Sequence, residues 1–258
     1  MNFAAYRALP AMNWSRLKDI HTSPKLFKYR EDHPRPDTPA LSNGRLIHMA
    51  VLEPERFASE CVIRPPGIDL RNKEGKAWKA SLEGRSIVDQ AVLDCADAVL
   101  TDPEASALLA GCKTEVTAEW VDQLTGVACK ARLDAAKSVA FIDLKSCRGL
   151  KQFHRDAENM LYHGQVAWYH DGAIAAGLIE PDADAYLIAV ESSEPFDVMV
   201  IRATRGTLDK GRCLCRSLLG LWQQCDETGL WPGMSPTTTD WELSAYAAGS
   251  YSKLEDLG

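Results

Sequence analysis

The pattern of hydrophobic and polar positions changes character in the middle of the chain. Between residues 114 and 146, apolar side chains alternate with polar ones or form short blocks, which is typical of strands. Turn residues separate these blocks, and we expect a hairpin turn over Asp122–Gly126 and a tight turn over Ala136–Ser138. The pattern predicts three consecutive strands and two later ones, at 114–121, 126–136, 138–146, 184–192 and 197–204.

Helical spacing of apolar residues dominates the rest of the chain. A short helix is expected within residues 1–35, capped by Ser15 and interrupted by Pro24. A helix break is expected at Asp102-Pro103, because proline cannot continue a helix. Further helices are expected from Ser42 or Asn43 to Pro54, over most of 77–110, from Leu150 to about Gly177 and from Leu208 to about Cys225.

These elements predict a single α/β domain over residues 1–258, with a mixed central sheet flanked by helices. Residues 1–110 are expected to be mostly helical, apart from a loop over 62–77. Residues 113–228 are expected to form the core, and 229–258 an irregular tail.

Composition and charge narrow the class of protein. Hydrophobic residues make up 46% and charged residues 25%, as is ordinary for a globular chain. The formal net charge is −7, so any contact with nucleic acid must come from a local basic patch. The densest positive charge lies in the 62–77 loop and just after it, at Arg64, Arg71, Lys73, Lys76 and Lys79.

The eight cysteines form no C-x-x-C pair, which fits reduced thiols better than a zinc ribbon or a disulfide scaffold. No stretch approaches the length of a membrane span, and the first residues do not form a signal peptide. We therefore expect a soluble protein of the cytoplasm with no membrane partner.

Two charged residues interrupt an otherwise apolar predicted strand, AFIDLKS. Asp143 and Lys145 are two apart, so their side chains share one face of the strand. Burying them is costly unless they bind each other, a metal or a substrate. The preceding hairpin places Asp134 beside Asp143, and a divalent cation relieves the repulsion between two close carboxylates. A plain structural ion pair at a strand edge is the other interpretation.

Three further features accompany this pair. His48 lies on an early predicted helix, and Glu115 on the strand before Asp134. Gln165 and Tyr169 are four apart and therefore share a helical face. Each feature alone is common in proteins without such a site.

Taken in order, these residues resemble one family of enzymes. The pattern G-x-x-x-H, E, D, D-x-K and Q-x-x-x-Y resembles the RecB-like branch of the PD-(D/E)XK nucleases, and within it the RecE-type (exonuclease VIII-type) nuclease domains. The resemblance extends from residues 13–24 to Trp231-Pro232 and is strongest over GVACKARLDAA and FIDLKSC. It implies a PD-(D/E)XK (restriction-endonuclease-like) core.

The resemblance also implies roles for individual residues. His48, Asp134, Asp143 and the backbone carbonyl of Leu144 would bind Mg²⁺, for which Mn²⁺ can substitute, and Glu115 would complete the site. Lys145 would position and help to deprotonate the attacking water and stabilise charge on the phosphate. Gln165 and Tyr169 would lie beside the site.

Relatives of this kind degrade linear double-stranded DNA. The resemblance implies 5′→3′ digestion that leaves 3′ single-stranded tails for a RecT-like annealing protein, by a ring-shaped homo-oligomer, with a tetramer favoured. It also implies a phage or prophage protein acting in a bacterial host. The loop residues Arg64, Arg71, Lys73 and Lys76 are then expected to clamp DNA, and Ser146 and Arg148 to contact phosphates.

Two alternatives remain open. Cys61, Cys213, Cys215 and Cys225 have the order found in CRISPR-associated or helicase-linked RecB-like nucleases with an iron–sulfur cluster, although C-x-C on a helix is a poor cluster geometry. The second alternative is a non-catalytic DNA-end-binding protein that keeps the fold.

Overall fold

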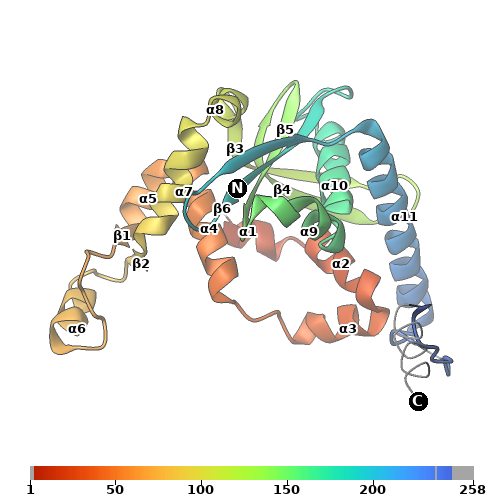
Figure 1. Cartoon of the computed structure of the whole chain (residues 1–258). Coiled ribbons are helices and arrows are strands. Elements are labelled where there is room, and N and C mark those ends of the chain that lie inside the picture. Colours follow the sequence, from red (N-terminus) through yellow and green to blue (C-terminus); the bar gives the residue numbers. More distant parts are fainter. Residues whose placement is uncertain (1–2, 236, 246–258) are drawn as a thin grey trace, which may run out of the picture.

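A five-stranded mixed sheet lies at the centre of the molecule (Figure 1). The structure is a computed structural model that describes residues 3–235 and 237–245. The strand order is β3-β4-β5-β6-β7, and all neighbours are antiparallel except β5 and β6, which are parallel. The strands are β3 (Lys113–Val121), β4 (Ala128–Lys137), β5 (Ala140–Cys147), β6 (Asp184–Glu191) and β7 (Val198–Arg202).

Helices cover both faces of this sheet. The helices before β3 are α1 (Phe3–Ala8), α2 (Trp14–Thr22), α3 (Pro24–Asp32), α4 (Pro39–Leu52), α5 (Pro54–Glu60), α6 (Lys73–Ala80), α7 (Gln90–Thr101) and α8 (Pro103–Leu109). Those after β5 are the short 3₁₀-helix η1 (Leu150–Gln152), α9 (Phe153–Asn159), α10 (Tyr162–Ala175) and α11 (Arg205–Thr228).

Two hydrophobic cores lie on opposite faces of the sheet. One core packs α2, α10 and α11 around residues such as Phe141 and Leu133. The other packs α4 and α7 around Ile142 and Leu144. Because β5 faces both cores, its residues 140–144 are all buried, and this explains why all of them except Asp143 are apolar.

Helix α10 packs closely against its neighbour α11. A Cβ atom at Gly211 of α11 would lie 2.1 Å from the carbonyl oxygen of His163 and 2.6 Å from the Cβ of Ala167. Only glycine therefore allows the two helix backbones to approach this closely. The contact holds α10 in place against the sheet, where α10 packs on β3, β4 and β5.

The five predicted strands and the mixed α/β architecture are confirmed. The second turn differs slightly, because Lys137 pairs with Ala140 and leaves Ser138 and Val139 as a two-residue loop. The helix break at Asp102-Pro103 is also confirmed, with Asp102 capping α8.

The expected single helix in residues 1–35 is wrong, since α1, α2 and α3 all lie there. The cap of α2 is Asn13, whose side chain accepts from the Arg16 N–H, whereas Ser15 lies inside the helix. Pro24 starts α3 at its first turn, where its missing N–H costs nothing, with Ser23 as the cap. The next helix starts earlier than expected, at Pro39 after the cap Thr38.

The predicted loop over 62–77 is also wrong in part. Strand β1 (Cys61–Ile63) pairs in parallel with β2 (Ser86–Val88), and α6 lies between them. We call residues 61–88 the basic arm; it projects from the body of the molecule beside α5 and α7 (Figure 1). It contains six basic and three acidic residues, so its formal net charge is +3, whereas that of the whole chain is −7.

Two other segments differ from expectation. The helix expected over 150–177 is split into η1, α9 and α10, with Leu161 in the left-handed region (φ 58°) before α10. Helix α11 is longer than predicted at both ends. The expected tail lies partly outside the described residues, and its residues 229–235 and 237–244 contain neither helix nor strand. None of the helices in the described part is long and apolar enough to cross a membrane.

Candidate active site

The candidate site lies where β4 and β5 separate. The two strands pair only over residues 135–137 and 140–142. Beyond these pairs the side chain of Asp134 reaches across and accepts a hydrogen bond of 2.8 Å from the Leu144 N–H. Farther along, β4 pairs instead with Met12, through the Ala128 carbonyl at 2.8 Å and the Lys130 N–H at 2.7 Å. The gap between the strands therefore opens directly beside Asp134 and Asp143.

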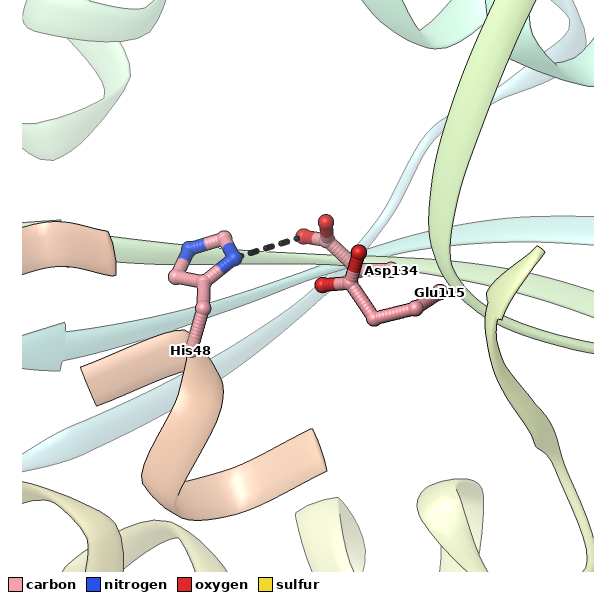
Figure 2. Close-up of side chains that lie close together, drawn as sticks. All are labelled: His48, Glu115 and Asp134. Carbon is pink, nitrogen blue, oxygen red and sulfur yellow. Dashed lines mark ion pairs between the residues drawn. The ribbon is translucent and has the colours of Figure 1, made fainter. Parts of the chain in front are cut away.

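Three side chains from different elements converge at this gap (Figure 2). His48 comes from α4, Glu115 from β3 and Asp134 from β4, and each offers one ligand atom within 4.8 Å of the others. The Nδ1 atom of His48 lies 3.4 Å from Asp134 Oδ2. Glu115 has a positive φ of 54°, which is rare outside glycine, in the register position opposite Asp134. This local distortion accompanies the placement of its carboxylate at the site.

Charge and burial shift the ionisation of this group. Burial lowers the pKa of His48, but Asp134 more than offsets this, so the net shift is upward. Burial also raises the pKa of Asp134, and His48, Lys145 and the Leu144 N–H bring it below its usual value. The pKa of Glu115 is raised by burial, even though Arg132 pairs with it. The three residues together favour a negatively charged pocket with one imidazole.

Asp143 and Lys145 lie beside this group and form an ion pair. Asp143 is 1% exposed, and burial raises its pKa to about 6, with Asp134 adding to the shift and Lys145 opposing it. Burial lowers the pKa of Lys145, but Asp143 and Asp134 raise it by more. The pKa of Lys145 therefore lies above its usual value, and the ammonium form is retained. Asp143 Oδ2 has no partner other than Lys145 in the described chain. We call His48, Glu115, Asp134, Asp143 and Lys145 the acidic centre.

Helix α10 contributes the two residues expected from its sequence. The Nε2 atom of Gln165 donates to Asp143 Oδ1 over 3.5 Å. Tyr169 packs edge-on against Phe141 with 5.9 Å between ring centroids, and burial raises the pKa of its hydroxyl well above the usual value. Both residues therefore lie on the side of α10 that faces the acidic centre.

Two contributors were missed in the sequence. Arg132 pairs with Glu115, and the ring of Tyr162 lies 4.9 Å from Lys145 Nζ in a cation–π contact. Simple periodicity points to both, because Arg132 is two residues before Asp134 on one strand and Tyr162 is three before Gln165 on one helix.

The acidic centre fits a divalent cation. An imidazole and two carboxylates whose ligand atoms lie within 4.8 Å of one another can share one ion, and hard oxygen ligands suit Mg²⁺ or Mn²⁺. This group contains His48, Glu115 and Asp134, whereas Asp143 is engaged by Lys145. The roles predicted for Asp143 and for the Leu144 carbonyl as ligands stay predictions.

The predicted DNA-contact residues lie in two places. Ser146 and Arg148 follow the acidic centre at the end of β5 and just after it, and a Cβ at Gly44 of α4 would lie 3.4 Å from Ser146 Oγ. The other four belong to the basic arm and do not join the acidic centre. Within or beside the arm, Arg64 pairs with Asp89 at 2.6 Å and Arg71 with Asp69 at 2.9 Å, and Lys73 and Lys76 lie exposed on α6.

The cysteines do not form the alternative cluster. Cys61 lies in the core between α4 and α7, whereas Cys215 lies in the opposite core beside α10. Across residues 3–235 and 237–245, no cysteine belongs to a group that could hold a metal ion. The structure therefore contradicts an iron–sulfur site built from Cys61, Cys213, Cys215 and Cys225.

Comparison with known proteins gives a family and a fold. A family model described as a PDDEXK-like domain of unknown function (DUF3799) matches residues 13–239. A solved structure of a candidate exonuclease from Eubacterium rectale is similar, with a TM-score of 0.64 and 14% identity, covering 96% of this chain and 97% of that one. A phage-related exonuclease from Haemophilus somnus 129PT aligns with a TM-score of 0.35 and 12% identity, covering 88% of this chain and 100% of that one. No curated protein matches the sequence.

Proposed function

Because this chain belongs to the PDDEXK-like family DUF3799, we propose that it is a metal-dependent nuclease that hydrolyses DNA at the acidic centre. One observation carries the proposal. Asp143 and Lys145 are buried side by side next to two further carboxylates, an arrangement that costs stability and that structure alone does not require. Strained, charged clusters of this kind are typical of catalytic sites.

Each residue then has a chemical role. His48, Glu115 and Asp134 would hold the cation, together with Asp143 and the Leu144 carbonyl. A bound Mg²⁺ or Mn²⁺ supplies Lewis-acid chemistry, which lowers the pKa of water and neutralises charge on phosphate oxygens. Lys145 positions the attacking water, helps to deprotonate it and stabilises negative charge on the phosphate.

The surrounding residues keep these groups in place. Gln165 orients Asp143, and the Tyr162 ring restrains the Lys145 ammonium. Arg132 compensates the charge of Glu115. In the hydrolysis, water attacks phosphorus, the bond to the leaving 3′ or 5′ oxygen breaks, and the proton from water passes to solvent or the leaving oxygen.

The proposed substrate is linear double-stranded DNA, attacked from an end. Two points support this choice. The Eubacterium rectale protein of the same fold is described as a candidate exonuclease. The basic arm also supplies local positive charge, through exposed residues such as Lys73 and Lys76, in an otherwise acidic chain.

The finer proposals rest on the resemblance to RecE-type domains. They are 5′→3′ polarity, delivery of 3′ tails to a RecT-like annealing protein, a ring-shaped homo-oligomer such as a tetramer, and a phage or prophage origin. Light scattering of the purified protein tests the oligomer, and co-purification with an annealing protein encoded alongside it tests the partner.

The first experiment is digestion of linear duplex DNA, labelled separately at the 5′ and 3′ ends, with Mg²⁺ or with EDTA. We expect metal-dependent loss of the 5′ label first, with closed circular DNA spared. Asp143→Asn and Lys145→Ala should each lower this activity by about 10³-fold or more. Asp209→Asn is the matched control, because it removes an exposed carboxylate that pairs with Arg212 on α11.

Each other outcome corrects a different part of the proposal. Loss of the 3′ label first would reverse the polarity but keep the chemistry. Cutting of closed circles would indicate an endonuclease. Folded protein that binds DNA ends but never cleaves them would replace the nuclease with a non-catalytic end-binding protein.

A further inference from the structure

We propose that Lys18 and Arg35 form a phosphate-binding subsite beside the acidic centre. This inference rests on the proposed function and extends it to two residues that have no predicted role.

Position is the first argument. Lys18 lies on α2, and its Nζ contacts the Sδ atom of Met160 at 3.8 Å. Met160 is two residues before Tyr162, whose ring lies 4.9 Å from Lys145 Nζ. The Lys18 amine therefore lies near the end of α9 and the start of α10, and Lys145 contributes to lowering its pKa, after burial and the charge of Arg35.

The second argument is what the Lys18 amine lacks. A thioether is a weak acceptor, and no carboxylate in the described part of the chain lies within 4.0 Å of this amine. Lys130 shows what a structural lysine looks like here. It is buried, and its Nζ donates to the carbonyls of Tyr6, Arg7 and Leu9 at 2.7 to 3.3 Å. Lys18 caps no such carbonyls and is only half-buried.

Arg35 supplies the second positive charge. Its Nη2 donates to Asp19 Oδ1 over 2.7 Å, and Asp19 follows Lys18 on α2. The Asp19 side chain is only 10% exposed, whereas that of Arg35 is 55% exposed. A buried carboxylate thus anchors one end of a guanidinium that stays largely exposed. Such an anchored fork is suited to bidentate contact with a phosphate.

Charge balance supports a phosphate as the ligand. The acidic centre contains three carboxylates and repels a DNA strand before any cation is bound. The two positive charges of Lys18 and Arg35 exceed the single negative charge of Asp19. This group therefore has a net positive charge beside the acidic centre. Phosphate contacts by basic side chains position a nucleic acid without reading its sequence. The ligand is either a terminal phosphate monoester or an internal phosphodiester.

The test measures DNA binding separately from cleavage. In an Asp143→Asn background, the affinity for a short duplex is measured by fluorescence anisotropy at salt concentrations from about 50 to 300 mM. Over this range, salt screens interactions between exposed charges increasingly strongly. We expect Lys18→Ala and Arg35→Ala each to weaken binding by about 5- to 10-fold and to lower the salt slope by about 1. Lys18→Arg should retain most of the affinity. The matched control is Lys28→Ala, which removes an exposed lysine paired with Glu31 on α3.

Duplexes with a 5′-phosphate and with a 5′-hydroxyl identify the ligand. A loss confined to the 5′-phosphorylated duplex assigns the subsite to the terminal monoester, and an equal loss on both assigns it to an internal diester. Arg35→Lys keeps the charge next to Asp19 and controls for unfolding, which is checked by thermal denaturation of every variant.

Two results separate failure of the subsite from failure of the nuclease. If both alanine variants bind like Lys28→Ala while the unmutated chain cleaves DNA, the subsite is wrong and the nuclease stands. If the unmutated chain binds but never cleaves, and the variants lose binding, the subsite stands and the nuclease is wrong. A chain that neither binds nor cleaves DNA overturns both.

Discussion

The acidic centre and the basic arm both depend on charged side chains, but in opposite physical settings. In the acidic centre, Asp143 is 1% exposed, and Lys145 and Asp134 are nearly covered. In the arm, ion pairs such as Arg71–Asp69 lie largely in solvent, with the Arg71 side chain 91% exposed. Both regions contain close ion pairs, so distance alone does not distinguish them.

The two settings differ in how much a single charged residue indicates about function. A buried charge loses its hydration and is retained only if something compensates the cost, so each residue of the acidic centre is informative by itself. An exposed ion pair contributes about 0 to 1 kcal/mol, and single arm residues therefore say little. The arm is informative only through its summed charge of +3.

The strongest test of this difference is to remove single charges from each region and compare the effects on nuclease activity. Lys145→Ala should lower nuclease activity by about 10³-fold, because a preorganised charge next to the reacting phosphate is lost. Lys76→Ala in the arm should change it less than about threefold, in keeping with the small worth of a solvated charge. Steady-state rates on one end-labelled duplex measure both, and equal effects would contradict the distinction.

Adding a divalent cation should separate the regions by stability. At a concentration of 100 times its dissociation constant, Mg²⁺ or Mn²⁺ should stabilise the fold by about 2.7 kcal/mol. The ion relieves repulsion among the carboxylates of the acidic centre. Urea denaturation with and without the ion measures the gain.

Asp134→Asn should remove most of that stabilisation. Asp69→Asn, which removes an exposed carboxylate of the arm, should leave it unchanged. A gain that persists in Asp134→Asn would mean that the ion binds elsewhere.

Glycines in close contacts provide a third test, because one of them, Gly211, lies in the body of the molecule and another, Gly75, lies in the arm. Gly211→Ala should lower the free energy of unfolding by about 1 to 3 kcal/mol, because its Cβ would clash with the His163 carbonyl oxygen at 2.1 Å. Gly220 on the same helix has nothing within 4 Å, so Gly220→Ala is the control and should be neutral or slightly stabilising. Chemical denaturation monitored by tryptophan fluorescence gives the values.

The arm offers a parallel substitution with a local result. A Cβ at Gly75 would lie 2.1 Å from the Asp69 carbonyl oxygen, so Gly75→Ala should disrupt the turn before α6. We expect faster proteolysis within 61–88 with an unchanged global unfolding midpoint. A lowered global midpoint would show that the arm folds together with the sheet.

The smallest effect should come from removing the arm lysines together. Lys73→Ala, Lys76→Ala and Lys79→Ala combined should leave the free energy of unfolding within about 0.5 kcal/mol. They should lower the salt slope of DNA binding by about 0.9 for each phosphate they contact. An unchanged slope in a salt titration would exclude the arm from the DNA interface.

Much of the sheet could be predicted because its signals are local. β5 is apolar over Ala140–Leu144 except at Asp143, and short turns bound it, so its sequence fits only a buried strand. The proximity of Asp134 and Asp143 follows from the hairpin between them. His48, Gln165 and Glu115 also lie at the site, although their proximity was expected only from the family resemblance.

Other features depend on contacts that the sequence does not reveal. The positive φ of Glu115 arises at a non-glycine residue, where no local signal marks it. The pattern predicts one N-terminal helix because proline usually interrupts a helix, whereas Pro24 begins a helix that Ser23 caps. The pattern predicts a loop in the arm because β1 and β2 have only three residues each and pair across more than twenty others.

The pairing of Met12 with β4 has a consequence for the order in which the protein is made. Met12 and α2 leave the ribosome early, but Met12 pairs with Ala128 and Lys130, and α2 packs against α11. At about 5 to 20 residues per second, Ala128 and Lys130 follow Met12 after roughly 6 to 23 s, and α11 follows α2 after roughly 10 to 40 s. During that interval α2 can pack against α3 but lacks α11, so its buried residues Leu17 and Ile20 are not yet enclosed in the core. Slow or stalled translation before α11 would therefore expose this segment to chaperones and proteases, although the strands of the sheet have already been synthesised.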